Sequence, residues 1–123
     1  MYATPDGESH FEDIEVAMRD AHSAAFAMNV GRSDPIAVAT MRFGCNPALD
    51  TDQRGVWQPW HPEARRQFVV RLQGELEVQV SDGDVRRLGP GSVMLAEDTT
   101  GRGHRARLLS DGESQALYIP LAE

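Results

Sequence analysis

Two histidines of this chain stand near side chains that can share chemistry with them. His61 precedes Glu63 by two residues and Gln67 by six, whereas His104 ends the stretch Gly101-Arg-Gly-His. Residues i and i+2 of a β-strand point to the same face, so an extended segment would bring His61 and Glu63 together. Two imidazoles and a carboxylate form a ligand set for Fe(II), Mn, Ni or Zn, and an amide oxygen adds a weak further ligand.

A metal-free pocket is the competing interpretation, and the sequence favours it. Pro62 interrupts the strand between His61 and Glu63, which would let Glu63 turn into solvent beside a neighbouring arginine. Two imidazoles alone would hold a divalent ion poorly. Imidazole transfers protons effectively near neutral pH, so His104 and His61 become candidate catalytic acid and base, with Gln67 orienting a tautomer or a substrate oxygen. Otherwise each histidine is a core residue with satisfied hydrogen bonds.

Arg71 follows Gln67 by four residues on a predicted strand, so strand alternation places both side chains on the inward face. A buried arginine requires a partner. The candidates are Glu77, Glu97 and the carboxylate of a ligand.

Glu97 and Asp98 form a carboxylate pair just before the glycine-rich loop that leads to His104. A carboxylate beside His104 would orient its imidazole, whereas a solvated turn is the other interpretation. Trp57 and Trp60 are expected at the mouth of a pocket or in the core, and either place implies a ligand of aromatic or polyketide-like bulk. Trp60 and Glu97 therefore join Gln67 and Arg71 as candidate substrate-binding residues.

The spacing of β-forming residues predicts an all-β domain. Residues 75–80 alternate strictly, with Leu76, Val78 and Val80 on one face. Turns are predicted at residues 81–84 and 89–91. Further strands are expected at 36–43, 67–72, 85–88, 92–96, 104–109 and 115–121, with a polar loop at 46–55. Short strands separated by turn signals are typical of a β-sandwich or barrel.

The first 35 residues carry a weaker pattern. Residues 1–10 are expected to be a loose arm, and residues 11–18 a strand or a short helix. Small residues within 19–34 favour a helical turn. The chain therefore divides into an N-terminal arm with an extra strand or turn, residues 1–35, and a barrel, residues 36–123.

The stretch from Gly55 to Gly74 resembles the first motif of the cupin superfamily. Gly55, His61 and Gly74 have the spacing of that motif. Glu63 stands at the position of its second histidine, and Gln67 at the position of its glutamate.

The end of the second cupin motif is similar to Gly101-Arg-Gly-His104, although Thr99 replaces its proline and Leu108 its trailing asparagine. Residues 60–67 and 97–104 also resemble signatures of small bacterial cupins. The resemblance implies a cupin double-stranded β-helix, that is, a jelly-roll barrel with an N-terminal arm. It also implies that His61, Glu63, Gln67 and His104 occupy the four metal positions, or line a metal-free pocket.

Composition narrows the classes of partner and compartment. A formal net charge of -7 argues against nucleic acid, which requires a basic face. No apolar run approaches the roughly 18 residues of a membrane span, and the polar N-terminus lacks the pattern of a signal peptide. Cys45 is the single cysteine, so an internal disulfide is impossible. We expect a soluble cytoplasmic protein that binds a small molecule.

Three functions are compatible with these observations. The first is an enzyme that uses His104 and His61 for proton transfer in the isomerisation, dehydration or cyclisation of a hydrophobic organic acid or polyketide-like substrate. The second is a metal-dependent oxygenase, and the third is a binding module without catalysis. We also expect a homodimer, because a small jelly roll leaves strand edges exposed, with residues 11–18 lying against the partner.

Overall fold

The computed structural model describes residues 1–48 and 53–123, which form strands, turns and loops with no helix among them. The strands are β1 (Tyr2–Ala3), β2 (Ser9–His10), β3 (Arg19–Ser23), β4 (Met28–Arg32), β5 (Arg42–Asn46), β6 (Gln67–Gln73), β7 (Leu76–Val80), β8 (Val85–Leu88), β9 (Val93–Ala96), β10 (His104–Leu108) and β11 (Ser114–Pro120). Residues 49–52, part of the expected polar loop, lie outside the described residues. The all-β prediction is confirmed.

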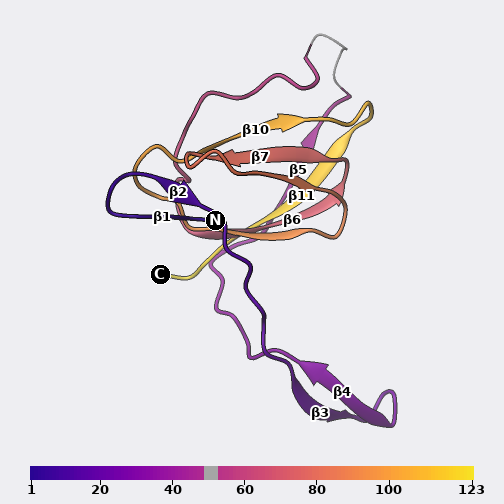
Figure 1. Ribbon diagram of the computed structural model, residues 1–123. Coiled ribbons are helices and arrows are strands. Elements are labelled where there is room, and N and C mark those ends of the chain that lie inside the picture. Colours follow the sequence, from indigo (N-terminus) through magenta and orange to yellow (C-terminus); the bar gives the residue numbers. More distant parts are fainter. Residues whose placement is uncertain (49–52) are drawn as a thin grey trace.

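Two antiparallel sheets form the barrel (Figure 1). Their strand orders are β5-β11-β6-β9 and β10-β7-β8. Segment 55–61 extends the second sheet beyond β10, because Gly55 N–H and Gln58 N–H donate to the carbonyls of Leu108 and Ala106 at 2.8 and 2.9 Å. With that segment counted as the second barrel strand and β5 as the first, the orders become 1-8-3-6 and 2-7-4-5. This is the pairing of a jelly roll. The predicted jelly-roll barrel is confirmed.

Strand alternation places the core between the sheets. Val78 and Val80 of β7 are 2% and 0% exposed, as their period-two pattern predicts. His104, Ala106 and Leu108 of β10 lie opposite Val80, Val78 and Leu76, which puts these side chains on the same inward face.

Residues 1–10 pack on the barrel, so the expectation of a loose arm there is wrong. Met1 is buried in one cluster with Val78, Val80 and Ala96. The hairpin of β1 and β2 is fastened to the barrel at Ser9, which is fully buried. An apolar side chain and a satisfied polar one thus close one end of the barrel.

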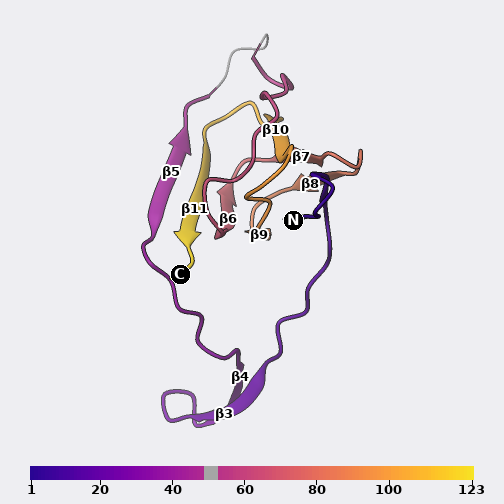
Figure 2. The same cartoon turned by 90° about the vertical axis from the view of Figure 1, so that its left-hand side faces the viewer.

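The predicted helical turn within residues 19–34 is also wrong, because β3 and β4 form a hairpin there. Its turn passes through Ala27, whose φ is 51°. A few small residues cannot offset the cost of nucleating a helix, whereas the hairpin forms backbone hydrogen bonds along its length. Residues 11–18 form neither the expected strand nor a helix. Figure 2 shows that the hairpin stands away from the barrel.

The strand expected at residues 36–43 begins later, at Arg42. Within residues 33–41, all of which the structure describes, only Val38 forms a β-bridge, with Leu121. Because this segment has apolar residues on both faces, the sequence predicted that other parts of the protein cover both faces. The described residues do not cover both of them.

Large apolar side chains are exposed along the arm formed by residues 11–41. Those at least 45% exposed are Ile14, Val16, Met18, Phe26, Met28, Ile36, Val38 and Met41. Within the described residues, β3 and β4 pair only with each other, and an isolated two-stranded hairpin is marginally stable in water. Residues 1–48 and 53–123 contain no helix with the length and hydrophobicity that a bilayer crossing needs.

We expect a second copy of the chain to cover this arm, giving a homodimer in solution. Sedimentation at tens of micromolar should show a dimer for the wild type. The double substitution Ile14→Asp and Met18→Asp should give a monomer, because it places charges in the interface. Val93→Asp, at an exposed valine outside the arm, is the matched control and should remain dimeric. A wild-type monomer at that concentration would contradict the prediction.

Candidate functional site

A cavity of about 390 Å³ lies between the two sheets, within the range of small-molecule sites. Five of the residues predicted from the sequence line it together: His61, Glu63, Gln67, Arg71 and His104. Its apolar wall is made of Val69, Leu76, Val78, Leu88, Met94, Ala106 and Leu108. Strand alternation therefore located the cavity, and the catalytic and binding roles of these residues stay predictions.

His61 and His104 are joined through their main chains. Each N–H donates to the carbonyl of the other residue, at 3.0 and 2.9 Å, and their rings lie 4.6 Å apart between centroids. His61 is exposed at the mouth of the cavity, and its Nδ1 lies 2.9 Å from the carbonyl oxygen of Pro59. His104 is buried. The pair thus connects the interior with solvent.

Glycine at position 103 permits this approach. Its φ is +73°, a conformation that L side chains rarely adopt, and a Cβ there would overlap the carbonyl oxygen of His61. Ser9 Oγ donates to the Gly103 carbonyl at 2.6 Å. The β1–β2 hairpin therefore holds the loop that carries His104, a role that sequence reasoning missed.

A buried carboxylate orients His104. Asp98 is fully buried, and its Oδ2 lies 2.7 Å from Nδ1 of His104. An ionised carboxylate accepts a hydrogen bond from Nδ1–H, which leaves the lone pair of the neutral ring on Nε2.

Glu97 does not line the cavity, so its prediction as a substrate-binding residue is not supported by this geometry. It pairs instead with Arg66, at 2.6 Å. Alternation from the buried Ala96 at the end of β9 gives the reason, because it turns Glu97 away and Asp98 inward. This alternation could have been read from the sequence.

Glu63 faces the cavity, so Pro62 does not turn it into solvent. Its main-chain N–H donates to the Asp98 carbonyl at 3.0 Å, which fixes the backbone beyond the proline. Gln67 Nε2 donates to Glu63 Oε1 at 2.9 Å. The glutamine thus presents an N–H, rather than its oxygen, to this carboxylate.

The donors around His104 fit a divalent metal. Glu63, Asp98 and His104 each offer a ligand atom, and these atoms lie within 4.8 Å of one another. Asp98 Oδ1 is buried with no hydrogen-bond partner. Two carboxylates and an imidazole suit Mn, Fe(II) or Zn after a small contraction. Compared with the predicted set, Asp98 joins this group, whereas His61 and Gln67 lie outside it.

Arg71 is 5% exposed, and burial lowers the pKa of its guanidinium. The two predicted protein partners are engaged elsewhere: Glu77 binds Arg107 at 3.0 Å, and Glu97 binds Arg66. In residues 1–48 and 53–123 we find no hydrogen bond or ion pair of the Arg71 side chain.

Trp60 is absent from the lining residues of the cavity, so this geometry does not support its prediction as a substrate-binding residue. The Arg102 and Arg105 guanidinium groups lie 5.3 and 4.9 Å from its ring, and Arg105 also lies 4.7 Å from Trp57. Alternation gives the reason, because His61 points to the cavity and its neighbour Trp60 points the other way.

Three solved structures illustrate what the chain is similar to. KdgF from Halomonas sp. is 23% identical with a TM-score of 0.46, covering 99% of this chain and 96% of that one. Protein NMB1881 from Neisseria meningitidis is 16% identical with a TM-score of 0.45, covering 72% and 83%. The Schizosaccharomyces pombe Cnp3 cupin domain is 12% identical with a TM-score of 0.46, covering 90% and 86%. No family model and no curated protein matches the chain. The jelly-roll assignment rests on the strand order, and these likenesses carry over no ligand or reaction.

Gly103→Ala should lower the free energy of unfolding by about 2–5 kcal/mol, since backbone strain and overlap with the His61 carbonyl add. Gly55→Ala is the matched control, because Gly55 has a φ of +74° and, apart from its chain neighbours, no atom of residues 1–48 and 53–123 lies within 4 Å of where the alanine methyl would stand. It should cost only the strain of about 1–2 kcal/mol. Urea unfolding measures both, and equal losses would show that the approach at Gly103 is unimportant.

Proposed function

We propose that the protein is a small-molecule enzyme in which His104, held by Asp98, transfers protons to and from a substrate in the cavity. The observation that carries the proposal is the buried pair itself. Asp98 and His104 have side chains 0% and 8% exposed, they lie 2.7 Å apart, and His104 lines a cavity of small-molecule size. An ion pair on the surface does not require this degree of burial. A catalytic acid/base histidine benefits from it, because the buried carboxylate fixes the tautomer of its ring.

The step begins with a substrate C–H bond next to a carbonyl group. Nε2 of His104 takes the proton, and the electron pair of the broken bond moves to the carbonyl oxygen, giving an enolate. Asp98 stabilises the imidazolium that forms. In a β,γ-unsaturated substrate, return of the proton to the γ-carbon of the conjugated enolate gives isomerisation. Its delivery to a hydroxyl leaving from the β-carbon gives dehydration with release of water. Attack of the enolate carbon on a second carbonyl of the same molecule, whose oxygen then takes the proton from His104, gives cyclisation.

The neighbouring side chains have supporting roles. One N–H of the Gln67 amide donates to Glu63, and the second can donate to the enolate oxygen. His61 lies beside His104 and is exposed, so it can exchange protons with water.

A metal-dependent reaction is the second candidate, favoured by the orphaned Oδ1 of Asp98. Glu63, Asp98 and His104 would hold the ion. When bound, such an ion supplies Lewis acidity or redox chemistry. Direct titration with Mn²⁺ or Zn²⁺, compared between the wild type and Glu63→Gln, measures this binding without reference to activity.

Deuterium exchange tests the proton-transfer proposal before the natural substrate is identified. Proton NMR in D2O follows exchange next to the ketone in a panel of straight-chain oxo acids. We expect His104→Gln to lower the exchange rate by about 10²–10⁴-fold. Asp98→Asn should also lower it, because an amide favours a different tautomer. Urea unfolding of each variant controls for folding.

Dialysis against EDTA should leave the exchange unchanged. Loss of exchange on chelation, with recovery on adding Fe(II) or Zn, would favour the metal-dependent reaction instead. Saturable binding of panel members without exchange would identify the protein as a binding module.

A further inference from the structure

The cavity contains a buried positive charge that the described residues leave unneutralised. Arg71 lines the cavity, and both carboxylates predicted as its partners bind other arginines. Burial disfavours the charged guanidinium, and Tyr118, which also lines the cavity, is the ionisable neighbour that opposes this effect on its pKa. A buried charge without a partner is costly, so a partner from outside the chain would remove that cost.

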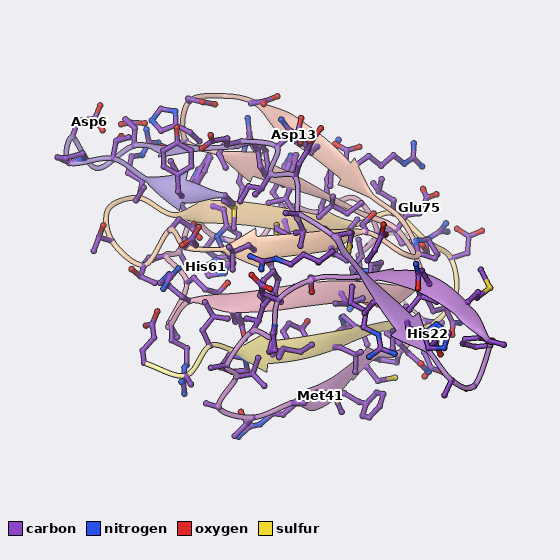
Figure 3. The ribbon with its side chains drawn as sticks, turned by 90° about the horizontal axis from the view of Figure 1, so that it is seen from below. Asp6, Asp13, His22, Met41, His61 and Glu75 are labelled. Atoms are coloured by element: carbon purple, nitrogen blue, oxygen red, sulfur yellow. The ribbon has the colours of Figure 1, made fainter. Side chains whose placement is uncertain are left out.

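Arg71 lies at the opposite end of the cavity from the buried acid/base pair. Gln67 and Arg71 are four residues apart on β6, which separates their Cα atoms by about 13 Å. The turn at Gly74 joins β6 to β7, so Arg71 shares its end of the barrel with Leu76. In Figure 3, His61 lies toward one end of the barrel and Glu75, in that turn, toward the other.

The wall between the two ends is apolar. In the sheet of β6 and β9, Val69 pairs with Met94 between the levels of Gln67 and Arg71. In the facing sheet, Ala106 pairs with Val78 between the levels of His104 and Leu108. A ligand reaching from Arg71 to His104 must therefore be apolar in its middle.

We propose that the substrate is a carboxylic acid whose carboxylate binds Arg71 and whose reactive carbon lies several bonds away, beside His104. The reactive end of this inference rests on the proposed function, whereas the anion site rests on Arg71 alone. One guanidinium neutralises a carboxylate and can bind both of its oxygens. A phosphate monoester carries up to two negative charges and would leave one of them buried without compensation.

Thermal unfolding with hexanoate and hexanamide, which share an apolar chain but differ in charge, tests the anion site. Hexanoate should raise the Tm of the wild type, and hexanamide should raise it much less. Arg71→Met should lose about 30-fold or more in affinity for hexanoate. Without ligand this variant should melt at or above the wild-type temperature, because it removes an unpaired buried charge. Arg71→Lys keeps the charge and should retain part of the response.

Two results would overturn the inference: an Arg71→Met protein that melts lower yet responds equally to hexanoate, or a stronger response of the wild type to hexyl phosphate than to hexanoate. The first would make Arg71 a structural residue, and the second would change the ligand class. His104→Gln separates this inference from the proposed function, since it should still respond to hexanoate. If the wild type catalyses no exchange in any oxo acid of the panel but keeps an Arg71-dependent response to hexanoate, the proposed function is refuted and the anion site stands.

Discussion

The reciprocal main-chain hydrogen bonds between His61 and His104 are the contact on which the site depends. They join segment 55–61 to β10, and so place two residues 43 positions apart in sequence on one rim of the cavity. The contact requires a glycine at position 103, because a side chain there would meet the His61 carbonyl. Backbone geometry, rather than side-chain affinity, therefore brings the two imidazoles together.

Two buried charged groups, Asp98 and Arg71, differ in whether another side chain of the protein compensates their charge. Asp98 lies against His104, so its charge is compensated inside the protein. Arg71, by contrast, has no charged partner among the described residues, although the barrel contains Glu77 and Glu97, which bind other arginines. Because an unpaired buried charge destabilises the fold, this difference supports the proposal that Arg71 serves a ligand rather than the fold.

Period-two alternation made most of the barrel predictable from the sequence. It placed Val78 and Val80 in the core, and Gln67 and Arg71 on a common inward face. Alternation counted from Ala96 would have placed Asp98, rather than Glu97, on the inward face. Alternation counted from His61 would have placed Trp60 on the outward face. The errors at these two positions arose from motif spacing, which identifies neighbours in sequence without saying which side of the strand each occupies.

The N-terminal third was harder to predict because its structure depends on distant contacts. Nothing local in residues 1–10 indicates that Met1 enters the core or that Ser9 binds the Gly103 carbonyl, 94 residues away. These contacts exist only once the barrel has formed, and their energy then outweighs local preference. The first ten residues thus become part of a site that lies far from them in sequence: by bracing Gly103, they hold in place the loop that presents His104 to Asp98.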